Sequence, residues 1–119
     1  MRFINFKKLL YSFRCAFRGI YITFREEQNF RIAVFLSFVV IFFMIYYKVA
    51  LNSKVILILT LIAGLVLEVL NTILEKIVDI LKPRVHPYAE VIKDMMSGAV
   101  LLAFLAWLVT VYLIFRPYV

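Results

Sequence analysis

The sequence of 119 residues has little of what soluble enzymes commonly use to build a site. It has three glycines, three prolines, one histidine and one cysteine. A single cysteine excludes an intrachain disulfide, and Cys15 fits a small packing residue better than a nucleophile. The isolated glycines exclude both a P-loop and the glycine-rich loop of protein kinases. Any phosphate binding must therefore depend on side chains and a metal ion.

Apolar residues, in contrast, are abundant. They make up 66% of the 14.0 kDa chain, well above the 45 to 50% that is usual in soluble domains. A single domain of this length cannot bury so many large side chains inside itself, so many of them must face another apolar phase. The composition excludes an ordinary soluble globule and indicates a membrane protein.

Charge is also unevenly distributed. The chain carries 14 Lys and Arg against 7 Asp and Glu, a formal net charge of +7, and seven of the basic residues lie within residues 1–31. Anionic lipids would attract this end of the chain. A nucleic-acid interface is not expected, because long uncharged apolar runs follow where a soluble basic face would be needed.

Residues 1–30 are expected to form an amphipathic helix at the membrane surface. Basic side chains project within about 40° of one another on the helix: Lys7, Arg14, Arg18 and Arg25. Beside them an apolar arc about 80° wide holds Phe6, Leu10, Phe13, Phe17, Ile20 and Phe24. An organelle transit peptide is the alternative, but it should lack the pair Glu26-Glu27. No secretory signal peptide is expected.

Three apolar segments predict an all-α membrane protein with three transmembrane helices, at 31–50, 54–81 and 90–115, in one domain of residues 1–119. A turn is expected at 50–54 and a proline-broken loop at 82–87. Eleven Lys and Arg lie on the side of the N-terminus and this loop, and three on the other side. The positive-inside rule therefore predicts a cytoplasmic N-terminus and an external C-terminus.

The second predicted span carries the most informative polar residues. One helix face about 80° wide holds Glu68, Asn71, Glu75 and Asp79. Like charges on one face of a helix repel each other. We therefore expect a cation, or a substrate that carries one, to bind at this face of the membrane helix. Glu68 follows thirteen uncharged residues, which favours a proton acceptor over a packing residue. Asp79 is equally consistent with a solvated helix end.

Lys93 and Asp94 open the third predicted span, with Ser97 and Gly98 one turn later. The lysine is suited to hold phosphate. The pair is equally consistent with an interfacial lysine anchor and an acidic residue at a helix N-terminus.

Two single residues complete the set of candidates. Glu27 is expected at the same membrane interface as Glu75, although a lone surface glutamate usually has no function. His86 has no second His or Cys for a zinc site and is more typical of a loop residue.

Together these residues resemble the signature of the prokaryotic diacylglycerol kinase family, which also includes undecaprenol kinases. The likeness covers nearly the whole chain. Its motifs are Phe17-Arg18-Gly19, Glu27-Gln28-Asn29-Phe30-Arg31, Glu68-Val69-Leu70-Asn71-Thr72, His86-Pro87, Lys93-Asp94, Gly98-Ala99-Val100 and Phe115-Arg116-Pro117. The resemblance implies a surface helix, three transmembrane helices and a homotrimer with active sites between subunits at the cytoplasmic interface.

The resemblance also implies roles for single residues. Glu68 is the expected catalytic carboxylate, which takes the proton of a lipid hydroxyl and contacts the lipid together with Ser97. Glu27 and Glu75 are the expected ligands of Mg²⁺. The expected nucleotide contacts are Glu27, Asn71, Glu75, His86, Lys93 and Asp94.

The resulting hypothesis is an ATP- and Mg²⁺-dependent lipid kinase of the bacterial plasma membrane, acting on diacylglycerol or undecaprenol. Phosphoryl transfer needs mainly positioning and charge neutralisation, which a metal between two carboxylates and one lysine can provide without a P-loop. One alternative is a small oligomeric transporter that uses Glu68 for proton coupling. Another is a membrane scaffold without chemistry.

Overall fold

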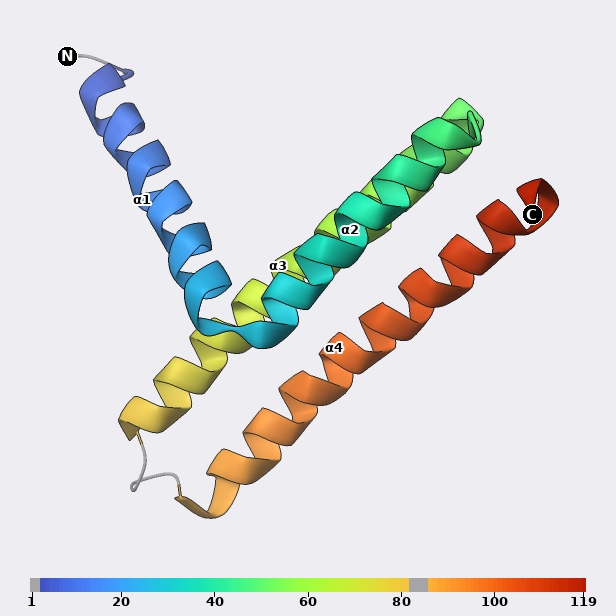
Figure 1. The fold of residues 1–119 in the computed structure, drawn as a ribbon. Helices are drawn as coiled ribbons and strands as arrows, with labels where there is room; N and C mark the ends of the chain where they lie inside the picture. The colour runs from blue at the N-terminus through green and yellow to red at the C-terminus, as the bar shows by residue number, and fades with distance from the viewer. Residues whose placement is uncertain (1–2, 82–85) are drawn as a thin grey trace.

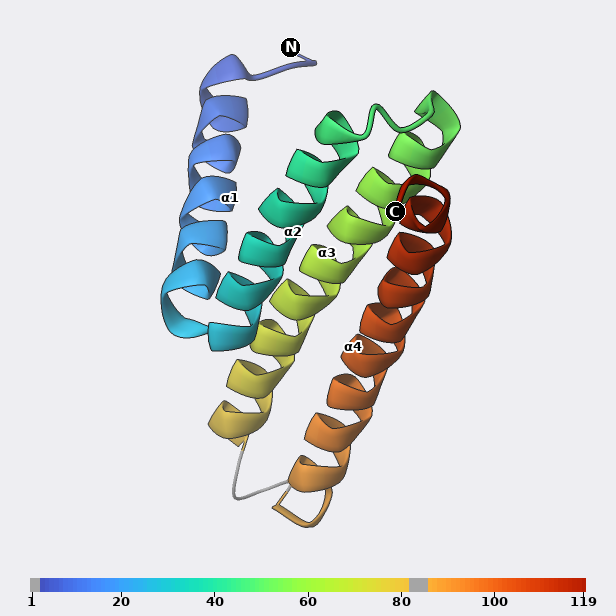
Figure 2. The same cartoon turned by 45° about the vertical axis from the view of Figure 1, so that its right-hand side comes forward.

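The computed structural model describes residues 3–81 and 86–119. Four helices follow one another, and the described residues contain no strand. They are α1 (Phe6–Glu26), α2 (Gln28–Tyr46), α3 (Leu51–Leu81) and α4 (His86–Phe115), followed by a short 3-10 helix, η1 (Arg116–Tyr118). In Figures 1 and 2, α2, α3 and α4 run side by side as a bundle with α3 in the middle, whereas α1 leaves the bundle at a steep angle in Figure 1.

Three of the helices are long and apolar enough to cross a membrane, over Gln28–Tyr46, Leu51–Leu81 and Pro87–Tyr118. They confirm the predicted all-α membrane fold of one N-terminal helix and three spans. The most apolar stretch of α4 contains no buried residue, whereas that of α3 is 28% buried, as expected for the central helix. A large apolar surface on these helices is therefore left for lipid or for other protein.

The best-packed region lies where α2, α3 and α4 meet near the α2–α3 turn. Its buried members are Val40, Met44, Val49 and Leu57. Leu57, only 1% exposed, is the most deeply buried of them. Trp107 of α4 packs against this cluster.

Leu57→Ala is expected to lower the free energy of unfolding by about 2 kcal/mol or more, because the cavity left behind loses its packing contacts. Leu59→Ala, two residues along on the same helix and 62% exposed, removes the same atoms from an exposed position and should cost less than half as much. Reversible unfolding in mixed detergent micelles measures both variants. Equal losses would show that α3 does not pack as described.

The turn between α2 and α3 covers residues 47–50 and so lies before the predicted one at 50–54, because α2 ends at Tyr46 and α3 begins at Leu51. Lys48 takes a left-handed conformation with φ 51°, and the N–H of Val49 donates to the carbonyl oxygen of Met44 at 3.3 Å. This is the hydrogen bond of a Schellman cap, completed by burial of both Val49 and Met44. The left-handed position of such a cap is usually occupied by glycine. Because a lysine occupies it here, the sequence did not indicate where α2 ends.

The predicted boundary between residues 30 and 31 also needs correction. The chain turns at Glu27, the single residue between α1 and α2, with extended φ −108° and ψ 115°. The N–H of Glu27 donates to the carbonyl oxygen of Thr23 at 2.9 Å, and Phe24 and Phe30 pack edge to face across the turn. We call residues 23–31 the elbow. It places Glu27 at the end of the bundle.

Helix α4 begins at His86, four residues before the predicted start of the third span. The predicted loop at 82–87 therefore overlaps the helix, and its residues 82–85 lie outside those that the structure describes. Pro87 is tolerated because the N–H groups of a first helical turn have no partner within the helix.

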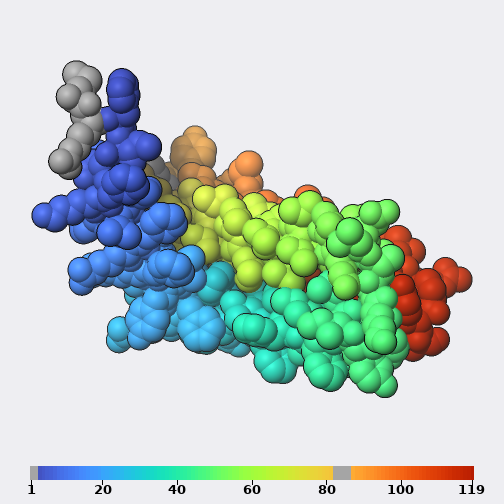
Figure 3. All heavy atoms as spheres, turned by 90° about the horizontal axis from the view of Figure 1, so that it is seen from above, coloured from blue at the N-terminus to red at the C-terminus, as the bar shows by residue number. Residues whose placement is uncertain are grey.

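Helix α1 forms a ridge across one end of the bundle (Figure 3). Its apolar face is not covered by the rest of the chain: Phe6, Phe13 and Phe17 are 71%, 56% and 70% exposed. An uncovered apolar face beside a basic face is the pattern of a helix that lies in a membrane interface.

Candidate functional site

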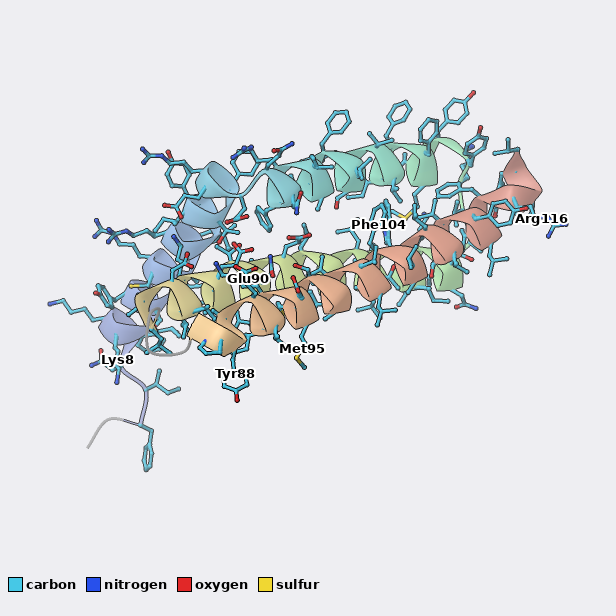
Figure 4. The ribbon with its side chains drawn as sticks, turned by 90° about the horizontal axis from the view of Figure 1, so that it is seen from below. Lys8, Tyr88, Glu90, Met95, Phe104 and Arg116 are labelled. Carbon is cyan, nitrogen blue, oxygen red and sulfur yellow. The ribbon has the colours of Figure 1, made fainter. Side chains whose placement is uncertain are left out.

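All seven acidic residues of the chain lie toward one end of the bundle, where α1 meets α2 and where α3 ends and α4 begins. They are Glu26, Glu27, Glu68, Glu75, Asp79, Glu90 and Asp94. Figure 4 shows this end from below, with Glu90 labelled. We call it the carboxylate end. Of these residues Glu68 lies deepest along the spans.

A cleft of about 350 Å³ opens between α2 and α4, with α3 as its floor. Its polar lining at the carboxylate end comes from Asn29, Glu68 and Ser97. Farther along the spans the lining is mainly apolar and includes Phe104, which projects from α4 toward α2 in Figure 4. The cleft therefore joins an acidic end to an apolar channel that runs along the helices.

Glu68 connects the cleft to the other carboxylates. Its side chain lines the cleft although the residue is only 8% exposed. The charges of two other carboxylates, Glu27 and Glu75, act on it, so acidic groups from the elbow and from α3 interact electrostatically with Glu68. The hydroxyl of Thr72 donates to the backbone oxygen of Glu68 at 3.0 Å and leaves the Glu68 carboxylate uninvolved.

Glu27 approaches the same site from the elbow. Burial raises the pKa of Glu27, and the charge of Glu75 raises it further, against the lowering effect of Lys76. Although Glu27 is the N-cap residue of α2, its side chain accepts no hydrogen bond from the described first turn of that helix. The carboxylate therefore keeps its oxygens for another partner.

Asn71 lies between Glu68 and Glu75 on the acidic face of α3. Its Nδ2 approaches Glu75 Oε1 at 3.5 Å, and the residue is only 7% exposed. The Oδ1 atom is buried and has no hydrogen-bond partner in the part of the chain that the structure describes. An unpaired buried acceptor is uncommon in proteins, and here it is available to a donor group of a ligand.

Lys93 pairs with Asp79 rather than with its neighbour in sequence. The Lys93 Nζ and Asp79 Oδ1 atoms are 2.8 Å apart and join α4 to α3. Asp94 and Ser97 are both exposed, and of the two Ser97 lines the cleft. The structure thus gives Asp79 a definite contact and places a lysine ammonium at the carboxylate end. The side chain of His86 lies outside the described residues.

The residues present fit a magnesium ion. Mg²⁺ takes oxygen ligands, keeps several waters and needs only one or two protein carboxylates, which Glu27 and Glu75 can provide. Among residues 3–81 and 86–119 no three His, Cys, Asp or Glu side chains form a complete metal cage.

Two contacts at this end were missed by sequence reasoning. Lys76 Nζ pairs with Glu26 Oε2 at 2.6 Å and ties α3 to α1. The Arg31 guanidinium donates to backbone oxygens in the last turn of α1. Each contact joins residues on two different helices. The period of a single helix cannot relate such residues, so it predicted neither contact.

The fold and the candidate site together define a small helical membrane protein in which a cleft between the spans ends among carboxylates at one end of the bundle. The model of the family "Prokaryotic diacylglycerol kinase" matches residues 14–115. The chain belongs to this family, as its motifs predicted, and family membership places it among lipid kinases.

Proteins from three bacteria are similar in sequence to this chain. A diacylglycerol kinase of Synechocystis sp. is 38% identical over 99 residues, which are 82% of this chain and 57% of the relative. An undecaprenol kinase of Bacillus subtilis is 32% identical over 89% of this chain and 86% of its own length. A diacylglycerol kinase of Helicobacter pylori strain J99 is 31% identical over 87% and 80%, respectively. This chain thus spans little more than half of the Synechocystis protein.

Proposed function

We propose that the protein transfers the γ-phosphoryl group of ATP to the hydroxyl of a membrane lipid, with Mg²⁺ as cofactor. The observation that carries this proposal is the buried Glu68 at the junction of an apolar cleft and a cluster of carboxylates. Membership of a lipid kinase family supports it.

In this proposal each candidate side chain has a role in the reaction. Glu27 and Glu75 would hold Mg²⁺, which neutralises charge on the phosphate oxygens when bound. Lys93 would leave Asp79 for a phosphate oxygen, and Asn71 would accept a hydrogen bond from the nucleotide. Asp94 and His86 complete the proposed nucleotide contacts. This division of work needs no glycine-rich loop.

Glu68 is the proposed proton acceptor. The lipid hydroxyl oxygen attacks the γ-phosphorus, the bond from that phosphorus to the bridging oxygen of ADP breaks, and the hydroxyl proton passes to the Glu68 carboxylate. The apolar channel beyond Glu68 would hold the lipid chain, and Ser97 would contact the lipid head. A carboxylate at the mouth of an apolar channel is suited to a substrate that is polar only at one end.

The proposed site lies at the inner face of the bacterial plasma membrane. An inside position for the carboxylate end agrees with the excess of Lys and Arg there. Helix α1 would lie in the headgroup layer with its exposed phenylalanines in lipid. The uncovered apolar surface of α4 and the open cleft leave room for further copies of the chain, and we propose a homotrimer.

Assay of the purified protein in mixed micelles tests the proposal. With equal amounts of diacylglycerol and undecaprenol present, we expect ATP- and Mg²⁺-dependent phosphorylation of one lipid at least 10-fold above the other, because one channel cannot match a two-chain and a polyprenyl substrate equally. Thin-layer separation of the labelled products measures both. No labelled product with either lipid would refute the proposed function. Proton flux into liposomes without ATP would favour the transporter instead.

A further inference from the structure

The side chain of Arg31 makes two hydrogen bonds to the backbone of another helix. Its Nη1 donates to the backbone oxygen of Arg25 at 2.7 Å and to that of Phe24 at 3.0 Å. Arg31 belongs to α2, whereas both acceptors belong to the last turn of α1. The side chain therefore reaches back over the elbow and binds the end of the preceding helix.

These two acceptors need a partner for a physical reason. The last four carbonyl groups of an α-helix have no N–H partner within the helix, and basic side chains can satisfy them. The usual alternative is a glycine just after the helix, but Glu27 stands there in extended conformation. The positive charge of the guanidinium also interacts favourably with the negative C-terminal end of the α1 dipole. Arg31 is thus the cap that α1 lacks in its own sequence.

The cap determines where Glu27 lies. Glu27 is the single residue between α1 and α2, and its backbone bonds to both, with its N–H to Thr23 oxygen at 2.9 Å and its own oxygen accepting from the N–H of Arg31 at 3.2 Å. Fixing the α1 end to the α2 start therefore fixes the direction in which the Glu27 carboxylate leaves the backbone.

The other tie between α1 and the bundle is weaker. The Glu26–Lys76 ion pair is about half exposed on both sides, and exposed pairs contribute at most about 1 kcal/mol. Apolar packing of Phe24 on Phe30 holds the elbow together but does not orient the backbone of Glu27. Within the elbow, the guanidinium is the side-chain group of α2 that donates directional hydrogen bonds to the backbone of α1.

We infer that Arg31 is a positioning residue that holds the Glu27 carboxylate in place for a divalent cation by capping α1 from α2. The inference rests on the proposed function, in which Glu27 and Glu75 share that cation. It adds a role for a residue to which the proposed function assigns none.

Activity as a function of Mg²⁺ concentration tests the role in the reaction. Arg31→Gln should raise the Mg²⁺ concentration for half-maximal activity by about 10-fold or more, while kcat at saturating Mg²⁺ falls less than 3-fold. Arg31→Lys, which keeps the charge and can make one of the two bonds, should lie between. Arg25→Gln removes a neighbouring positive charge but no cap and should match the wild type. A fall in kcat with an unchanged Mg²⁺ requirement, or an equal shift in Arg25→Gln, would overturn the inference.

A second measurement does not depend on kinase activity. Spin labels at the exposed Cys15 of α1 and at Ile80→Cys, an exposed site near the end of α3, report the distance between the two helices by pulsed electron resonance. Labelled protein diluted into Cys15→Ser protein avoids distances between copies. The distance distribution should broaden in Arg31→Gln and stay narrow in Arg25→Gln. An unchanged width in Arg31→Gln would overturn the inference even if the wild-type chain proved inactive and the proposed function failed.

Discussion

Glu68→Gln is expected to lower kcat for lipid phosphorylation by about 10² to 10⁴-fold, the usual contribution of a positioned proton acceptor. Glutamine keeps the shape of the side chain and its polarity but cannot take the hydroxyl proton. The KM for ATP should change little, because Glu68 lies at the mouth of the apolar channel. Steady-state kinetics in mixed micelles with the preferred lipid measure both constants.

The matched control is Glu90→Gln, which removes a carboxylate from the same end of the bundle but from an exposed position outside the cleft. Its activity should stay within about 3-fold of wild type. Unfolding of Glu68→Gln should show no loss of stability, because the variant removes a buried charge that sits near two like charges. A fully active and folded Glu68→Gln would rule out the proposed proton acceptor.

The variants Glu27→Gln and Glu75→Gln should each lower activity at physiological Mg²⁺ by about 10²-fold or more. Each removes one oxygen ligand of the proposed ion and part of the negative charge that attracts it. Since both act on one ion, the double variant should be little worse than either single variant, a non-additivity typical of residues that act as a unit. Activity measured over a range of Mg²⁺ and Mn²⁺ concentrations tests this.

Glu26→Gln is the matched control for these variants, because Glu26 is adjacent to Glu27 and pairs with Lys76 at the surface. We expect less than a 3-fold change. Strictly additive losses for Glu27 and Glu75, or an equal loss in Glu26→Gln, would show that the two carboxylates do not share a metal ion.

The part of the candidate site that lies on α3 could be predicted as a common face. Glu68, Asn71 and Glu75 follow the helical period, so their common face needs no knowledge of tertiary structure, and the structure shows Asn71 beside Glu75 on α3. The three spans could be predicted for a similar reason, since long uncharged runs have few alternatives in a chain so rich in apolar residues.

Contacts between helices could not be predicted in this way. The pairing of Lys93 with Asp79 instead of Asp94 depends on how α4 lies against α3. The helical period of the sequence gives no information on how two helices pack. The ends of the helices were misplaced for local reasons. Lys48 takes a conformation that usually marks glycine, and an arginine from the next helix caps α1.

Glu27 alone separates α1 from α2, so the connection cannot absorb a change in the number of residues. An inserted or deleted residue anywhere between Phe24 and Glu27 would swing the whole of α1 around its own axis by about 100°. Its phenylalanines would then turn from the hydrocarbon toward water while its arginines turned inward. The number of residues in the elbow thus sets the rotation of α1 about its axis. The same number therefore determines both which face of α1 meets the bilayer and where the Glu27 carboxylate lies relative to its neighbours.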